Sequence, residues 1–213
     1  MSDDVTVAER VDRLALRARD AIPGCEVVGV SVARRGLLET RAATGDLARE
    51  LDACQHLAGE GPCLDAFYSE GVYRTGDLWA DERWPRFSLL TRDLDVRSML
   101  SYRLFTEADS LGSLNVYSSR QHAFSDEAMV LGAIFAAHAA VALARAQEHE
   151  EAENLQRALE SNRMIGTAVG ILMATQRLSA EDALERLSRA SQRTNTKLKV
   201  LAEQVVLTGR LPE

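Results

Sequence analysis

The chain contains no proline between Ser125 and Gln176. Proline interrupts a helix more strongly than any other residue, so this stretch predicts one long helix or two helices in succession. Ser125, Asp126 and Glu127 supply an N-cap and an acidic first turn, which places the start of the first helix. From this point on, the sequence changes from a mixture of elements to helices alone.

Apolar and small residues recur along this stretch at steps of four and three. They are Leu155, Leu159, Asn162, Gly166, Val169 and Met173. Such a heptad-like stripe is typical of a coiled coil, in which a polar residue such as Asn162 sets the register. The same stripe would suit a helix packed against its own domain, and we favour dimerisation over that alternative.

The first part of the chain alternates between short helical and strand-like segments. Helical patterns mark residues 5–21, 47–57, 64–68 and 84–94, and strand patterns mark 25–33, 37–44, 72–75, 98–105 and 111–117. The last two strands are separated by a short turn and are expected to form an antiparallel hairpin. The order of helix, strands, helices and strands indicates an α+β fold rather than regularly alternating βα units.

Two short helices are expected to close the chain. Ser179 with Glu181 and Asp182 resembles a capping box, and the segment 193–196 breaks the helix that follows. The apolar residues of the two helices recur at helical spacing: Ala183, Leu184, Leu187 and Ala190, then Leu198, Leu201, Ala202, Val205 and Val206. Together with the end of the long helix, they can bury their apolar sides as a three-helix unit.

Composition excludes several classes of protein. The chain has 213 residues, 46% of them hydrophobic, and a net charge of −7, which suits one sizeable core and argues against indiscriminate DNA coating. No run of about 18 uninterrupted apolar residues occurs, and the acidic N-terminus lacks the features of a signal peptide, so we expect a cytoplasmic protein. Three irregularly spaced cysteines suggest neither a disulfide framework nor a metal site.

Charge is distributed unevenly along the chain. From Asn154 onward there are nine basic and six acidic residues, a net charge of +3, and the preceding segment has 16 basic and 26 acidic residues, a net charge of −10. In the basic segment Arg186, Arg189 and Arg193 share one helix face, beside the apolar stripe. Asn195, Lys197 and Lys199 follow. These residue types suit contacts to nucleic-acid phosphates and bases, although a solvated charged face is the usual explanation.

The stretch GEGPCL, residues 59–64, could be a phosphate-binding loop, a reactive-thiol site or a structural corner. It lacks the lysine of a phosphate-binding loop, and Pro62 has no backbone N–H to offer a phosphate. Pro62 would instead begin a helix, with Cys63 in the first turn, where free N–H groups favour a thiolate. Cys63, with Cys54 and His56 nearby, is therefore a candidate redox sensor, while burial as a small apolar residue is the simpler explanation.

The basic segment resembles an ANTAR domain, a small RNA-binding module of bacterial transcription antiterminators. The resemblance depends on the stretches NLQRAL (154–159), IGTAVGILM (165–173), SAEDALERL (179–187), SQRTNTKL (191–198) and VLTGRLP (206–212). It implies a homodimer that binds paired RNA hairpins in nascent transcripts and so prevents a terminator from forming. Arg163, Gly166 and Gly170 on the long helix join the candidate RNA contacts, and Val169 stands where the family often has a lysine.

The preceding part resembles the GAF sensor domain that is found in front of ANTAR in actinobacterial regulators. The matching stretches are LDACQHLAGEGPCLDA (51–66), RWPRF (83–87), VRSMLSYRL (96–104), LGSLNVYS (111–118) and AIFAAHAAVALA (133–144). The resemblance implies an antiparallel sheet with flanking helices that binds a small molecule or senses redox state. We therefore expect a GAF domain in residues 1–146, and a linker helix with an ANTAR domain in residues 147–213.

The sequence thus predicts a non-enzymatic, signal-responsive antiterminator whose sensor ligand and cofactor it does not identify. Two alternatives stay open. Some GAF-fold proteins reduce free methionine sulfoxide with cysteines, so a thiol-dependent reductase is one. The other is a DNA-binding regulator, because two short helices behind a sensor domain resemble a helix-turn-helix.

Overall fold

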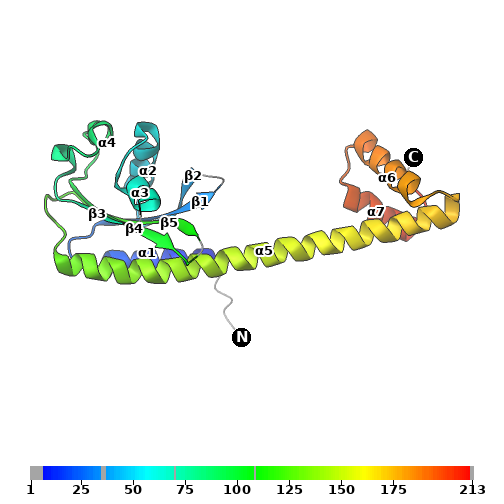
Figure 1. The fold of residues 1–213 in the computed structure, drawn as a ribbon, viewed down its shortest axis with the longest axis horizontal. Coiled ribbons are helices and arrows are strands. Elements are labelled where there is room, and N and C mark those ends of the chain that lie inside the picture. The colour runs from blue at the N-terminus through cyan, green and yellow to red at the C-terminus, as the bar shows by residue number, and fades with distance from the viewer. Residues whose placement is uncertain (1–6, 35–36, 70, 108, 212–213) are drawn as a thin grey trace. The chain divides into compact units, whose positions relative to one another are not determined.

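The computed structural model describes residues 7–34, 37–69, 71–107 and 109–211 of the chain. The chain divides after Gln147 into two compact units, each with a hydrophobic core of its own. Helix α5 (Asp126–Gln176) contributes residues to both units (Figure 1). The proline-free stretch therefore forms a single helix of 51 residues, the first of the two predicted alternatives.

The first unit contains most of the shorter elements. They are α1 (Val7–Ala21), β1 (Val27–Arg34), β2 (Leu37–Ala43), α2 (Asp46–Ala58), α3 (Pro62–Tyr68), β3 (Val72–Thr75), the 3-10 turn η1 (Leu78–Ala80), α4 (Pro85–Leu90), β4 (Ser98–Phe105) and β5 (Ser110–Ser118). The predicted start of the first helix, residues 5 and 6, lies outside the described residues. The helix predicted to reach residue 94 ends at Leu90, where the Thr91 hydroxyl donates a hydrogen bond to the Ser88 carbonyl.

The five strands form one sheet in the order β2-β1-β5-β4-β3, and all neighbouring strands run antiparallel. The predicted hairpin of β4 and β5 is confirmed, with Ser101 opposite Asn115 and Tyr102 opposite Leu114. In the middle of the sheet β5 also pairs with β1, so that Ser31 lies opposite Ser113. The three central strands therefore align their alternating positions, so that side chains pointing to the same face of the sheet lie next to one another.

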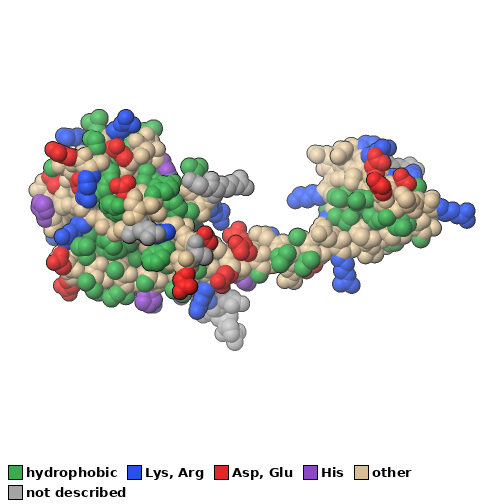
Figure 2. Space-filling view, in the orientation of Figure 1, with side chains coloured by type: hydrophobic (Ala, Val, Ile, Leu, Met, Phe, Trp, Pro, Cys, Tyr) green, Lys and Arg blue, Asp and Glu red, His purple; other side chains and the backbone are tan. Residues whose placement is uncertain are grey.

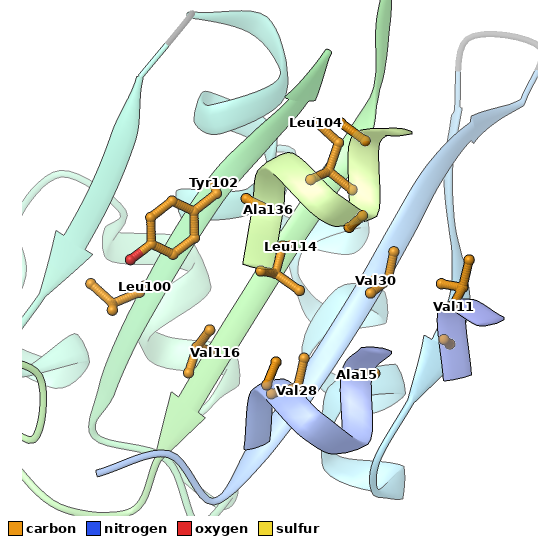
Figure 3. Packing of buried hydrophobic residues seen from close by; sticks show 14 of the residues in the cluster. Val11, Ala15, Val28, Val30, Leu100, Tyr102, Leu104, Leu114, Val116 and Ala136 are labelled. Atoms are coloured by element: carbon orange, nitrogen blue, oxygen red, sulfur yellow. The ribbon is translucent and has the colours of Figure 1, made fainter. Parts of the chain in front are cut away.

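One face of the sheet is covered by α1 and the first part of α5 (Figure 1). Because successive side chains of a strand point to opposite faces, Val28 and Val30 of β1 point to this side together with Leu114 of β5. Figure 3 shows these side chains facing Ala15 of α1 and Ala136 of α5. This face is predominantly apolar and forms the principal hydrophobic core of the first unit.

The opposite face of the sheet is covered by α2, α3 and α4 (Figure 1). Its apolar residues gather toward the rim, where Trp84, Phe87 and Met99 are buried. Toward the centre, the strands present small and polar side chains to the helices. The candidate sensor site lies on this second face, between the sheet and helices α2 and α3.

The GEGPCL stretch is a structural corner between α2 and α3. Gly61 has a φ of 147°, and a Cβ atom there would lie 2.4 Å from the Gln55 side-chain oxygen, so only glycine fits. Pro62 begins α3 as predicted. The Glu60 carboxylate accepts hydrogen bonds from the backbone N–H groups of Arg86 (2.6 Å) and Phe87 (3.2 Å) at the start of α4. The stretch therefore ties three helices together.

The second unit packs the end of α5 against α6 (Ala180–Thr194) and α7 (Leu198–Thr208). Ser179 caps α6 by accepting a hydrogen bond from the Asp182 N–H. The core residues that are at least nine-tenths buried are Ala168, Leu172, Ala183, Leu187, Ala190, Leu201, Ala202 and Val205. The predicted three-helix unit is confirmed. The prediction for Leu184 is wrong, because this side chain lies at the edge of the α6 stripe and is 43% exposed.

Helix α5 is long and apolar enough to cross a membrane, by length and composition alone. A third of its most apolar 18-residue segment is buried inside the structure. The core helix of a soluble protein passes the same test, and the first part of α5 packs on the sheet. The apolar character of α5 thus reflects, in part, its role in the core.

Candidate nucleic-acid interface and sensor site

The predicted basic face of α6 is exposed. Ala183, Leu187 and Ala190 point into the core of the second unit, whereas Arg186 and Arg193 are exposed to solvent. Arg189 is exposed too, and its guanidinium lies 2.6 Å from the carboxylate of Glu185, one turn earlier. Figure 2 shows Lys and Arg side chains projecting from the surface of the second unit. A nucleic acid can reach these guanidinium groups without any change in the core.

The turn between α6 and α7 continues this surface. Asn195 ends α6 in the left-handed conformation, with a φ of 49°, and its backbone N–H donates to the carbonyls of Ser191 and Gln192. The Ser191 hydroxyl donates to the Thr196 carbonyl at 2.6 Å, which fixes the chain direction into α7. The side chains of Asn195 and Lys197 are exposed, and Lys199 is half-buried. The turn therefore presents an amide and a cation directly beside the arginines of α6.

The other three predicted RNA contacts lie on α5. Arg163, Gly166 and Gly170 are exposed, and a Cβ atom at either glycine would meet nothing within 4 Å. Contacts within the described chain therefore do not require glycine at these positions. The surface left open could receive another molecule closely. Val169 is part of the predicted coiled-coil stripe, but it packs against the core of the second unit and is half-buried.

A chain of buried polar side chains lies between the sheet and helices α2 and α3 of the first unit. The Asp52 carboxylate accepts hydrogen bonds from the hydroxyls of Ser31 (2.5 Å), Thr40 (2.6 Å) and Tyr117 (3.4 Å). Burial raises the pKa of Asp52 above its usual value, although these hydrogen bonds and His56 oppose the shift. Burial also raises the pKa of the Tyr117 hydroxyl, with Asp52 adding to the effect.

Polar contacts continue from α2 to the centre of the sheet. The Gln55 side-chain oxygen accepts a hydrogen bond from the Cys63 N–H at 2.8 Å, and the Cys63 sulfur lies 2.9 Å from the Ser113 hydroxyl. The Asn115 amide donates to the same hydroxyl at 3.4 Å. Four buried residues from two helices and one strand thereby form a continuous polar path.

Three buried polar atoms beside this path have no hydrogen-bond partner among the described residues. They are the Gln55 Nε2, the Asn115 Oδ1 and the Ser101 hydroxyl. Ser101 lies opposite Asn115 in the sheet, and all three side chains are at most 1% exposed. An unpaired buried polar group costs about 1–3 kcal/mol, so such a group is usually satisfied by a bound molecule or an ordered water. This site offers a donor, an acceptor and a hydroxyl.

The structure places the three candidate redox residues around α2 and α3. Burial, followed by the charge of Asp52, raises the pKa of the Cys63 thiol to about 12. The pKa of Cys54 is also raised by burial, and its sulfur lies 3.9 Å from the Leu90 carbonyl oxygen. His56 contacts the Leu38 carbonyl. Cys63 is thus a buried thiol with a raised pKa, and a redox role for Cys63, Cys54 and His56 stays a prediction.

Sequence reasoning missed the buried polar residues between the sheet and α2. They are Ser31, Ser101, Ser113, Asn115 and Tyr117 of the strands, and Asp52 and Gln55 of α2. A signal was present, since Ser113 and Asn115 alternate with Leu114 and Val116 in a predicted strand. Polar residues in such a pattern usually face solvent, and here α2 and α3 cover them. Within the residues that the structure describes, no three His, Cys, Asp or Glu side chains gather as a metal site.

An antiparallel α+β domain with a polar centre, followed by a helical unit with an exposed basic face, has the architecture of a regulatory protein. Comparisons with known families agree. A model of the GAF domain matches residues 4–144, and a model of the ANTAR domain matches residues 153–206. The chain belongs to the GAF family, with an ANTAR domain behind its GAF domain. This combination fits a regulator rather than an enzyme, and both domains are typical of soluble cytoplasmic proteins.

Solved structures resemble the first unit in fold. A GAF domain from a Coxiella burnetii phosphoenolpyruvate-protein phosphotransferase has a TM-score of 0.56 at 17% identity, over 70% of this chain and 89% of that one. A type II free methionine-R-sulfoxide reductase from Thermoplasma acidophilum has a TM-score of 0.53 at 17% identity, over 65% and 95%. At this identity the similarity concerns the fold alone. A search of the curated proteins finds no match.

Proposed function

We propose that the protein is a signal-responsive, RNA-binding transcription antiterminator. Its ANTAR domain would bind hairpins in nascent transcripts, and its GAF domain would control that binding. The observation that carries the proposal is the exposed basic face of α6, where Arg186 and Arg193 flank Arg189, whose guanidinium pairs with Glu185 of the same helix. The packing of Ala183 and Leu187 in the core leaves this face free.

Several features favour RNA over duplex DNA as the partner. Arginine and asparagine side chains at a helix end suit the unstacked bases of a hairpin loop, which RNA readers recognise by stacking and hydrogen bonds. The matched ANTAR model is associated with RNA binding. Arg163, with Gly166 and Gly170, would approach the RNA from α5, while Lys197 and Lys199 would contact phosphates.

The polar centre of the first unit supports the sensing role. A GAF domain that binds no ligand would gain stability from an apolar centre, yet Gln55, Ser101 and Asn115 leave polar atoms unpaired there. We propose that a small molecule occupies this site and satisfies these atoms. Sensing through Cys63 is the weaker version of the proposal, because burial holds this thiol protonated.

RNA binding is tested with a leader transcript that carries two hairpins, by fluorescence anisotropy over a range of salt concentrations. Arg186→Ala with Arg193→Ala removes two exposed guanidinium groups without touching the core, so we expect weaker binding and a salt dependence flatter by about two units of slope. Arg92→Ala is the matched control, because it removes an exposed arginine from the first unit and should leave binding unchanged. Unchanged binding by the double variant would contradict this surface.

The same purified protein is used to test the two alternative functions. Stronger binding of duplex DNA than of the hairpins would indicate a DNA-binding regulator. Thiol-dependent reduction of free methionine sulfoxide would indicate a reductase, and here the raised pKa values of Cys25, Cys54 and Cys63 argue against turnover. A homodimer is part of the proposed function, because paired hairpins call for paired binding surfaces.

A further inference from the structure

Helices α1 and α5 lie side by side on the apolar face of the sheet and leave a groove between them (Figure 1). Two hollows, of about 590 Å³ and about 440 Å³, make up this groove. Arg10, His138 and Ala142 line both hollows, so the two join into one continuous space, here named the α1/α5 groove. Sites for small molecules usually measure about 300–1,000 Å³. The groove therefore has the size of a ligand site, and the sheet separates it from the polar centre.

The floor of the α1/α5 groove is apolar. Leu14 of α1 and the α5 residues Phe135 and Ala142 line it and are half-buried. Ile134 and Val141 also line the groove, with 49% and 55% of their surface exposed. Apolar side chains that gather at a surface in contact with water mark a binding site more often than scattered ones do. An occupant of the groove should therefore carry an apolar part.

The rim of the same groove is basic. Arg10, Arg13 and Arg17 follow one another at steps of three and four, so they share the side of α1 that lines the groove, and Arg145 is added from α5. No Asp or Glu is among the residues that line either hollow. Arg13, Arg17 and Arg145 are exposed, and none of the three forms a salt bridge with another described residue. Because the chain before Asn154 has a net charge of −10, these cations stand out from an acidic background.

We propose that the α1/α5 groove binds a free long-chain fatty acid, with the carboxylate between Arg13 and Arg17 and the acyl chain extended along α5 toward Val141. The carboxylate lies at this end because three of the four arginines line the larger hollow. A guanidinium binds a carboxylate through two parallel hydrogen bonds, and each buried methylene of the chain adds apolar contact. This inference goes beyond the proposed function, since it adds a second ligand site and does not depend on RNA binding.

Other occupants match only part of the groove. A second copy seated in the groove through the same surface would bring its arginines against Arg13 and Arg17, and like charges oppose such pairing. A bilayer surface is bound by apolar side chains that project from a helix, whereas Leu14 and Ala142 lie recessed between two helices. A nucleic-acid backbone would use the arginines through its phosphates and leave the apolar floor uncovered. A single acyl chain with one anionic end matches both the floor and the rim.

The first test titrates the full-length chain with sodium octanoate, decanoate and dodecanoate, below their micelle concentrations, by isothermal titration calorimetry. Each added methylene that enters the groove should tighten binding by up to about fourfold. Dodecyltrimethylammonium has the same chain as dodecanoate and the opposite charge, so it should not bind at the groove. Equal binding of the two, or an affinity that does not change with chain length, would overturn the inference.

The second test changes the groove itself. Arg13→Gln with Arg17→Gln removes the partners of the carboxylate and should weaken dodecanoate binding by about tenfold or more. Arg49→Gln with Arg92→Gln is the matched control, because it removes two exposed arginines of the same unit that do not line the groove. Ala142→Leu narrows the point where the two hollows join, so it should retain octanoate binding and lose the gain from longer chains. If circular dichroism shows that Ala142→Leu is unfolded, the arginine pair decides alone.

Sedimentation with phosphatidylglycerol vesicles distinguishes a free fatty acid from a membrane surface. We expect no more protein on these vesicles than on neutral phosphatidylcholine vesicles. Vesicle binding that the Arg13→Gln, Arg17→Gln chain loses, without saturable binding of dodecanoate, would replace the inference with a membrane contact. Absence of dodecanoate binding, or equal affinity of the arginine pair variant and its control, would refute the site. RNA binding plays no part in these measurements, so their failure leaves the proposed function standing.

Discussion

The two faces of the sheet in the GAF domain differ in the polarity of the side chains at their centres. The face under α1 and α5 is predominantly apolar, with Val30, Leu100 and Leu114 buried beside alanines of the helices (Figure 3). The face under α2 and α3 carries Ser31 and Asn115 at its centre, and both are fully buried. Side chains are therefore fully buried on both sides, while the centre of the second face is polar and that of the first is apolar.

This difference separates the residues that hold the domain together from those that are available for a ligand. Each buried aliphatic side chain contributes about 1.5–3 kcal/mol through removal of apolar surface from water. A buried hydroxyl or amide contributes little even when it is paired, and it costs stability when it is not. The polar face is thus a part of the core that the fold alone does not explain.

The largest expected effect contrasts two neighbours in β5. Leu114→Ala leaves a cavity in the apolar face and should lower the free energy of unfolding by about 2–5 kcal/mol. Asn115→Ala removes an amide whose oxygen has no partner in the described chain, so it should cost about 1 kcal/mol or less. Urea unfolding followed by circular dichroism measures both. Equal losses would show that the two faces carry the same share of the stability.

The α5 region shows which features the periodicity of the sequence predicts and which it does not. The lack of proline between Ser125 and Gln176 was sufficient to predict helix, and the structure joins the stretch into one element. Of the predicted stripe, Leu155 and Leu159 are exposed, whereas Val169 packs against the core of the second unit, as the alternative of a helix packed against its own domain expects. Spacing identifies a face of a helix, and tertiary packing decides which partner covers it.

The candidate sites show which features local sequence patterns do not predict. The turn that contains Asn195 follows from local chemistry, because asparagine tolerates the left-handed conformation that ends α6. The polar centre does not follow, because Asp52 meets Ser31 and Thr40 only after α2 has folded over two strands that are distant in sequence. No local pattern reports that Ser113 in a strand will be covered by helices rather than by water.

A second, smaller effect concerns pH. Burial raises the pKa of the Asp52 carboxyl in the folded protein, so the folded chain binds this proton more tightly than the unfolded chain. The resulting stabilisation is fully present below the unfolded pKa, about 4, and is lost as the pH rises through the folded pKa. We therefore expect the stability of the unchanged protein, relative to Asp52→Asn, to fall as the pH increases from about 4.

Urea unfolding of both proteins between about pH 4 and pH 8 measures this relative stability. The substitution to asparagine keeps the shape of the side chain and removes its titration, so the difference between the two curves reports on Asp52. A difference that instead grows with pH would mean that the hydroxyls of Ser31, Thr40 and Tyr117 stabilise the carboxylate more than burial disfavours it.

The smallest expected effect separates two serines of the polar face. Ser101→Ala removes a buried hydroxyl without a partner in the described chain, so the stability of the ligand-free protein should be unchanged or raised by up to about 1 kcal/mol. Ser113→Ala removes the hydroxyl that contacts Cys63 and Asn115, and it should lower stability by about 1 kcal/mol. Thermal unfolding of both variants decides between the two roles. If Ser101→Ala destabilises the protein more than Ser113→Ala does, the Ser101 hydroxyl already has a bound partner, and the polar face is filled before any signal arrives.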